Sequence, residues 1–477
     1  MNKYYFFFGE GSKVNQYICA ILINLAVLAY GAAVGWMSPM TLLLQSDQSP
    51  AGAPLSDTVV SWMASVSYMV CIPATLLFAG VEERLGRKAA LLGMSSCMAI
   101  CWVIKLSSME VWAFIAARAV FGLAMGAAFV VAPVYVKEIS DDSIRGTLGS
   151  LVVLSQTTGN LVMYVVGDYL SYRGCLWFCL ALPAVHIVLF LMMPESPSYL
   201  VKNGELEEAA RVVAWLRCSR EDSALVKAEI DTLQKEQDND KESSKFAMKA
   251  IWSDKILRRA FYIALAVTLA REVCGANPVL NFAAYIFELA DSGLVLSPNQ
   301  QAMMLGAVQV AGSALASSVV EKAGRKPLLF TSSLISGASM CVLASWFVLR
   351  ARGVPAPGWL PVSALCLCIF CDAAGLQPIS MVVMNEIFSF KYRSSVSAVT
   401  MGLASSTDFV QLLTFKPLAN SIGIEYCFYF FGAVCLVNSV YVIFKLPETK
   451  QRSLEEIYEK LKTKKERESE KVKAVEA

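Results

Sequence analysis

Long stretches almost free of charged residues constrain this chain more than any other feature of its sequence. Eight of them span residues 14–46, 57–81, 89–104, 146–167, 174–194, 292–320, 327–349 and 426–444. Four more apolar stretches carry one or two internal charges, at 111–136, 260–287, 353–385 and 394–424. A membrane helix needs about 20 apolar residues, and its backbone polar groups must be paired within the segment. Because these stretches are continuous rather than alternating, we predict an all-α membrane protein with twelve spans.

The composition agrees with this prediction and excludes several functions. The chain is 56% apolar and 17% charged, against about 45–50% and about 25% in soluble domains. A formal charge of +2 argues against a nucleic-acid binder. The chain has one histidine, His186, and its cysteines are scattered through apolar stretches, so we expect no metal and no other cofactor. Without a phosphate-binding loop or a nucleophile elbow, we also expect no enzyme activity.

Basic residues mark the cytosolic side of the predicted bundle. They cluster at 84–88, 137–145, 322–326 and 391–393, whereas the opposite loops 47–56 and 291–298 carry acids only. The positive-inside rule therefore places both termini in the cytosol. A long polar segment separates six spans from six. We predict a cytosolic N-terminus at 1–16, six-helix halves at 17–193 and 258–446, a cytosolic helical linker at 194–257 and a cytosolic tail at 447–477.

Short motifs recur in the two predicted halves. Glu83-Arg-Leu-Gly-Arg-Lys88 returns as Glu321-Lys-Ala-Gly-Arg-Lys326, and Glu138 with Arg145 returns as Glu386 with Arg393. The sequence Pro194-Glu-Ser recurs as Pro447-Glu-Thr. Duplicated six-helix halves are typical of transporters whose halves rock around a substrate at the membrane midplane.

These motifs resemble those of the sugar porters of the major facilitator superfamily, most of all the insect facilitated trehalose transporter branch. The resemblance runs from about residue 17 to 460 and rests on Pro447-Glu-Thr-Lys450, Leu454-Glu-Glu-Ile457 and the set Arg118, Gly122, Gly126, Pro133, Tyr135, Glu138 and Arg145-Gly146. It implies a monomer in the plasma membrane. It also implies alternating access and a small sugar or glycoside as the substrate, with the lipid bilayer as the other partner.

The repeated charged motifs predict a cytosolic gate. Basic residues after the second and eighth spans can pair with acids at neighbouring helix ends. When the gate opens, these ion pairs would break and the charged groups would be hydrated instead. Membrane insertion alone would place basic residues here, but the repetition with acids at fixed spacing favours a gate. The predicted gating set is Glu83, Arg84, Arg87, Lys88, Glu138, Arg145, Glu195, Glu321, Arg325, Lys326, Glu386, Arg393 and Glu448.

The substrate-binding pattern of the family is largely rewritten in this chain. Where the seventh helix of sugar porters has Q-Q-x-S-G-x-N-x-x-x-Y-Y, this chain keeps Gly275 and Asn277 but replaces the glutamines and tyrosines. The tenth-helix tryptophan is also lost. A site built for sugar hydroxyls discriminates strongly against other ligands, so the substrate should differ. The resemblance implies substrate contacts at Arg271, Glu272, Asn277, Asn281, Phe282, Gln156, Gln309, Gln377 and Met381.

Arg271 is the most informative of these residues. An arginine at the bilayer centre is costly, about 3 kcal/mol on insertion scales, and needs a partner. Neighbouring helix residues point apart, so Glu272 is expected to be a poor partner. A structural pair, with Asp408 for example, and an anion-binding fork for a substrate both stand as interpretations. For the anion site, Arg271→Gln should spare the uptake of neutral sugars and abolish that of anions.

Acidic residues inside the spans leave the coupling ion open. The family arginine of the fourth helix is Arg118, which faces a first-helix aspartate in proton-coupled members, and residues 14–46 hold no acid. That favours facilitated transport. Glu272, Asp372 and Asp408 remain candidate proton carriers, with Arg118 as a further possible coupling residue. The alternative is that Asp372 and Asp408 lie near helix ends or pair with Lys416. We expect His186 to be a core or lipid-facing residue.

Three functions therefore remain open. The first is a facilitative carrier of sugars or glycosides. The second is a proton-coupled carrier of an anionic, sulfated glycoside such as a glucosinolate. The third, from a different class, is a sugar sensor that binds without transport.

Overall fold

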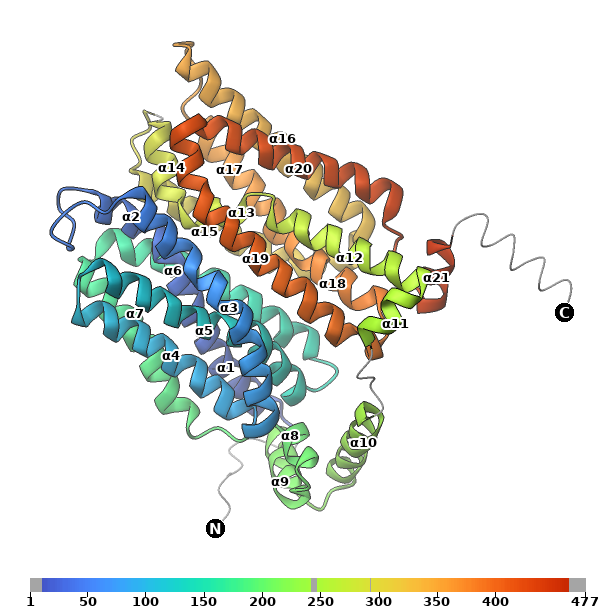
Figure 1. Ribbon diagram of the computed structural model, residues 1–477. Coiled ribbons are helices and arrows are strands. Elements are labelled where there is room, and N and C mark those ends of the chain that lie inside the picture. The colour runs from blue at the N-terminus through green and yellow to red at the C-terminus, as the bar shows by residue number, and fades with distance from the viewer. Residues whose placement is uncertain (1–10, 242–246, 292, 463–477) are drawn as a thin grey trace, which may run out of the picture. The chain divides into compact units, whose positions relative to one another are not determined.

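The computed structural model describes residues 11–241, 247–291 and 293–462, and every regular element in these ranges is a helix (Figure 1). Contacts divide the chain into two compact units. The first comprises residues 1–243 with 281–285, and the second comprises 244–280 with 286–477. The boundary at 243/244 falls inside the predicted linker, most of whose helices belong to the first unit.

Ten helices of the first unit follow one another along the chain. They are α1 (Val14–Gly35), α2 (Met37–Gln45), α3 (Asp57–Leu85), α4 (Arg87–Ser107), α5 (Val111–Ile139), α6 (Arg145–Tyr169), α7 (Tyr172–Phe190), α8 (Pro197–Lys202), α9 (Leu206–Leu216) and α10 (Ala224–Lys241).

The second unit repeats this plan with more breaks. Its helices are α11 (Ala247–Ser253), α12 (Lys255–Glu272), α13 (Ala276–Asn281), α14 (Ala283–Ala290), α15 (Pro298–Ala323), α16 (Arg325–Ala351), α17 (Leu360–Cys371), the π-helix η1 (Asp372–Leu376), α18 (Gln377–Ile387), α19 (Phe390–Ile422), α20 (Ile424–Lys445) and α21 (Leu454–Leu461). Residues 281–285, which end α13 and begin α14, are grouped with the first unit.

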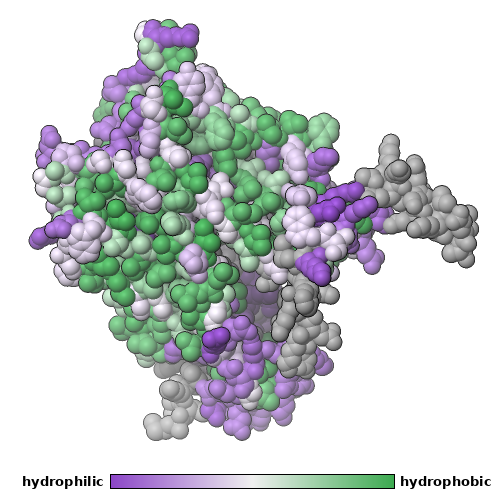
Figure 2. All heavy atoms as spheres, viewed as in Figure 1, coloured by the Kyte–Doolittle hydropathy of each residue, from purple (hydrophilic) through white to green (hydrophobic). Residues whose placement is uncertain are grey.

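Ten stretches of the described residues are long and apolar enough to cross a membrane. They coincide with ten of the twelve predicted spans. The other two predicted spans correspond to α15 and α19, whose lengths of 26 and 33 residues also suffice for a crossing. Large apolar side chains such as Leu76, Trp177 and Val188 lie exposed on these helices. Figure 2 shows apolar residues covering much of the visible face of the first unit and hydrophilic residues gathering over α8 and α9.

Glycines allow close helix packing within each unit. A Cβ built on Gly31 of α1 would lie 2.0 Å from the backbone oxygen of Gln156 on α6. In the second unit, a Cβ on Gly337 of α16 would lie 3.0 Å from the backbone oxygen of Gly432 on α20. Small residues let membrane helices approach until their backbones touch, which replaces the hydrophobic driving force that lipid removes.

The predicted span 260–287 is not one helix. Helix α12 ends at Glu272, and the chain turns through Gly275 before α13 begins at Ala276. Gly275 has φ +88°, and a Cβ there would lie 2.4 Å from the Phe431 ring, so only glycine fits this turn. A second irregularity, η1, interrupts the predicted span 353–385. Both breaks lie beside the buried ionic cluster described below.

Candidate functional site

The motif Arg87-Lys88 lies at the centre of an ion-pair cluster in the first unit. Arg87 donates from Nε and Nη2 to Glu138, the shortest distance being 2.8 Å from Nη2 to Oε1. It also donates to the backbone oxygen of Glu82 at 3.2 Å. Ser196 donates to the same Glu138 carboxylate. The arginine at the start of α4 thereby ties together the end of α3, the start of α4 and the end of α5.

Arg325 lies at the centre of a matching cluster in the second unit. Its Nε and Nη2 donate to Glu386, with 2.7 Å from Nη2 to Oε1. Its Nη1 donates to the backbone oxygen of Val320 at 3.2 Å, and Thr449 donates to Glu386 at 2.5 Å. The sequence repeat is therefore also a repeat of hydrogen bonds, with each side chain replaced by its counterpart.

A carboxylate covers the first turn of the helix in both clusters. Glu195 accepts from the backbone amides of Arg87 and Lys88 at 2.9 and 3.1 Å. Glu448 accepts from those of Arg325 and Lys326, both at 3.0 Å. Helix N-termini favour negative charge because their amides are unpaired and the dipole is positive there. In each unit, the glutamate of the repeated Pro-Glu motif therefore caps the N-terminus of a helix, α4 in the first unit and α16 in the second.

The two capping carboxylates differ in acidity. Burial has the largest influence on Glu195 and raises its pKa, although the amides of Ser196, Lys88 and Arg87 act in the opposite direction. Burial also acts to raise the pKa of Glu448, but the surrounding backbone amides outweigh it and hold the pKa below its usual value. The difference follows from how deeply each carboxylate is buried.

The remaining predicted gating residues have other partners. Lys202 pairs with Glu83 at 2.8 Å, and the Arg84 backbone oxygen accepts from Tyr199. Glu138, at the end of a neighbouring helix, binds Arg87, whereas Arg145 binds the exposed Asp142 at 2.6 Å.

In the second unit, Arg393 donates to the backbone oxygen of Phe388 at 3.4 Å and not to Glu386. The side chain of Glu321 lies outside the described part of the chain.

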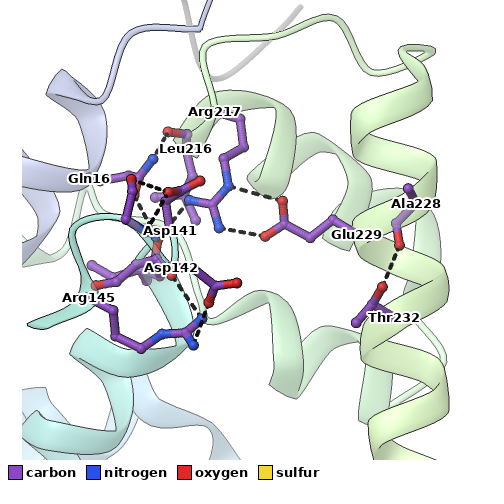
Figure 3. A network of polar contacts seen from close by, with 12 residues as sticks. Gln16, Asp141, Asp142, Arg145, Leu216, Arg217, Ala228, Glu229 and Thr232 are labelled. Atoms are coloured by element: carbon purple, nitrogen blue, oxygen red, sulfur yellow. Dashed lines mark hydrogen bonds and ion pairs between the residues drawn. The ribbon is translucent and has the colours of Figure 1, made fainter.

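A further polar network, which the motifs did not predict, ties the linker helices to the first unit (Figure 3). Gln16 at the start of α1 donates to the backbone oxygen of Leu216 at 3.2 Å and accepts from the amide of Asp141 at 2.8 Å. Arg217 binds Glu229 of α10 at 2.5 Å and the backbone oxygen of Ile139 at 3.1 Å. This network is formed by individual polar residues that belong to no recognisable motif. From the sequence, only the amphipathic pattern of α9 and α10 could be predicted.

The second unit buries an arginine among three carboxylates. Arg271 donates from Nη1 to both oxygens of Glu272 at 2.7 Å, and its Nε lies 3.4 Å from Oδ1 of Asp372. Asn277 donates to Oε2 of Glu272 at 3.2 Å and to Oδ1 of Asp408 at 2.6 Å. The side chains of Arg271, Glu272 and Asp372 are 15%, 7% and 2% exposed. We call these five residues the Arg271 cluster.

Two expectations about Arg271 are wrong. Glu272 is a close partner because α12 ends there, so the long arginine side chain folds back over the helix end where no further turn intervenes. The second carboxylate is Asp372 rather than Asp408. Asp372 lies at a helix end, because α17 ends at Cys371 and η1 begins at Asp372, and it is buried in the second unit. π-Helical turns are frequent at functional sites.

The structure brings together only some of the predicted substrate residues. Arg271, Glu272 and Asn277 share the cluster. Gln309 on α15 is buried, Gln377 begins α18 and Met381 is 36% exposed. Asn281 and Phe282 are buried next to the α13–α14 junction. Gln156 lies on α6 of the first unit.

Arg118 is held by backbone groups in the first unit. It donates to the backbone oxygens of Met63 at 2.8 Å and Ala33 at 3.1 Å, and its guanidinium lies 4.9 Å from the ring centre of Phe121. Within the described part of the chain its hydrogen-bond partners are therefore carbonyls. His186 is buried, as expected, and its Nδ1 contacts Ser95 at 2.7 Å.

Two duplicated helical halves with matching ion-pair clusters define a multi-pass membrane transporter. The xylose transporter XylE from E. coli has the same fold. Its inward open structure matches with a TM-score of 0.75 and 18% identity, covering 94% of this chain and 100% of XylE. Its partially occluded structure matches with a TM-score of 0.76 and 18% identity, covering 92% of this chain and 100% of XylE. The fold is that of the major facilitator superfamily.

The chain belongs to the sugar transporter family, described as "Sugar (and other) transporter", which matches residues 13–461. Members of this family are transporters and not enzymes. The facilitated trehalose transporters Tret1 of Aedes aegypti and Polypedilum vanderplanki are similar over 449 residues, at 28% and 27% identity. Each match covers 94% of this chain. The chain spans 55% of the Aedes relative and 88% of the Polypedilum relative.

Proposed function

We propose that this protein carries an uncharged sugar or glycoside across the membrane by alternating access. The observation that carries the proposal is the Arg271 cluster, which occupies the helix break at which transporters of this architecture bind their substrates. Glu272 and Asp372 both lie within ion-pair distance of the arginine. An arginine that already lies within ion-pair distance of two buried carboxylates has little charge to offer a further anion. The cluster therefore supports a neutral ligand over a sulfated one.

The cytosolic clusters suggest how the halves would move. Each ties the ends of several helices within one unit, through Arg87 and Glu138 in the first and Arg325 and Glu386 in the second. Such ties keep a half rigid while it rocks, as alternating access requires. We propose a plasma-membrane location with both termini cytosolic, because the basic loops all fall on one side.

Uptake into oocytes tests the proposal with glucose, trehalose, sucrose, a neutral plant glucoside and a sulfated glycoside. Water-injected cells and a surface-labelling assay are the controls. We expect uptake of one or more neutral compounds and none of the sulfated one. Selective uptake of the sulfated compound would reassign Arg271 to anion binding. Binding of a neutral sugar without uptake would instead indicate a sensor.

A further inference from the structure

The charges of the Arg271 cluster do not balance. One guanidinium faces the carboxylates of Glu272, Asp372 and Asp408, and Glu272, Asp372 and Asp408 are 6%, 1% and 5% exposed. A buried ionised carboxylate without compensation costs several kcal/mol, so groups in this position bind a proton or a cation instead. If every carboxylate were ionised, the cluster would carry two uncompensated negative charges, 1 − 3 = −2.

Glu272 and Asp408 form a carboxyl pair inside this cluster. The same amide nitrogen of Asn277 donates to both, at 3.2 and 2.6 Å. This shared donor places the two carboxyl groups next to each other in the buried cluster. Two carboxyl groups that share a buried site hold one proton between them, because like charges so close together cannot both ionise.

An independent feature of the neighbouring carboxyl group points in the same direction. Oδ1 of Asp372 is fully buried without a hydrogen-bond donor in the structure, although it lies 3.4 Å from Nε of Arg271. Asp372 opens the π-helical turn, whereas Glu272 ends α12. Unwound backbone and half-helix C-terminal ends are the places where transporters coordinate Na⁺ or H⁺.

The groups around the cluster do not supply the missing positive charge. The nearby titratable groups of the adjoining elements are thiols, namely Cys274, Cys368, Cys371 and Cys435. Helices α15 and α16 contribute neutral polar side chains such as Gln309, Ser313, Ser332 and Ser336.

The charged residues of the adjoining helices are engaged or distant. The acid of α18, Glu386, is paired with Arg325. Lys416 of α19 lies two turns beyond Asp408, roughly 12 Å along the axis.

We propose that the Glu272–Asp408 pair is a proton-coupling site in the second half of this transporter. This inference rests on the proposed function, because the proton moves together with the neutral sugar. A proton from the outer solution binds a carboxylate oxygen of the pair, crosses with the substrate and leaves to the cytosol. No other atom is exchanged.

Asn277 connects the proton to the sugar. When both carboxylates are ionised, the side-chain amide of Asn277 donates hydrogen bonds to both of them and is held between them. When one is protonated, the new carboxyl hydrogen bond takes over part of this role, and the amide can turn towards a sugar hydroxyl. Protonation and sugar binding therefore favour each other. Arg118, whose hydrogen bonds go to backbone carbonyls, takes no part in this exchange.

The test is uptake of glucose, trehalose and a neutral plant glucoside into oocytes at about pH 6 and about pH 7.5, with membrane current recorded. For the wild type we expect a faster uptake at the lower pH, on the order of tenfold, because the proton concentration differs by about thirtyfold. The neutral sugar should also evoke an inward current. In Asp408→Asn and Glu272→Gln the ratio of the two uptake rates should fall to about one.

The matched control is Asp291→Asn, which removes an exposed carboxylate paired with Arg350 and should keep the wild-type ratio. Uptake of a neutral sugar that is independent of pH and carries no current overturns the proton site and leaves the proposed function standing. An unchanged pH ratio in both cluster variants also overturns the proton site. Surface-expressed protein that takes up none of the neutral sugars at either pH overturns the proposed function itself.

Discussion

At the scale of single residues, the sequence identified Arg271 but not its environment. A buried arginine in a span was visible in the sequence, and so were Glu272, Asp372 and Asp408. Their grouping depends on the turn at Gly275 and on η1, which bring groups from four elements together. Neither irregularity follows from apolar periodicity. The sequence therefore identified the charged residues of the cluster but mispredicted which carboxylates pair with Arg271.

The cluster reverses the effect expected of Arg271→Gln. Without the guanidinium, Glu272 and Asp372 lose their positive partner while remaining buried. Removing one member of a buried ion pair costs about 3–5 kcal/mol, so we expect a strong loss of thermal stability in detergent and of neutral-sugar uptake. Arg350→Gln is the control, because its pair with Asp291 is exposed and worth about 1 kcal/mol or less. A variant as stable as the wild type would contradict this account.

At the scale of helices, the sequence predicted well where the helices lie but poorly where they are interrupted. All twelve predicted spans fall on helices, and the linker helices α9 and α10 lie where their amphipathic pattern placed them. The breaks at Glu272 and Asp372 were missed, because the residues on either side are equally apolar.

The helix-capping carboxylates should respond to pH with opposite signs. Glu448 has a lowered pKa, so it stabilises the fold at neutral pH, and this stabilisation is lost as the pH falls through the folded-state value. Glu195 has a raised pKa, so its protonated form is favoured by the folded state at low pH. This stabilisation is lost as the pH rises through the folded-state pKa. The destabilisation by Glu448→Gln should therefore grow from about pH 4 to about pH 7, whereas that by Glu195→Gln should shrink.

Thermal unfolding of the purified variants between about pH 4 and about pH 7 measures how the destabilisation by each substitution changes with pH. Each effect should be about 1 kcal/mol or less, because solvent screens these partly exposed groups. Glu207→Gln on α9, whose side chain is 94% exposed, is the control and should show no slope. Equal slopes for Glu195→Gln and Glu448→Gln would contradict the proposed difference in acidity.

At the scale of the whole molecule, duplication is the feature that sequence and structure share most closely. The repeated motifs predicted two equivalent clusters, and the structure forms both with the same set of donors and acceptors. What the sequence could not decide is whether these charges join the halves or strengthen each half. The described ion pairs lie within one unit in each case, which favours the second role.

Additivity distinguishes these two roles. Arg87→Gln and Arg325→Gln each leave a half-buried glutamate without its partner, so each should destabilise the protein by about 1.5–3 kcal/mol, as expected for a lost hydrogen bond to a charged group. The two clusters share no residue, and independent sites add to within about 0.5 kcal/mol. If each cluster strengthens its own half, the free energies of unfolding lost in the single variants should sum to that of the double variant. A double variant that loses markedly less than the sum would show that one network spans both halves, and that the charged motifs act as a gate between them.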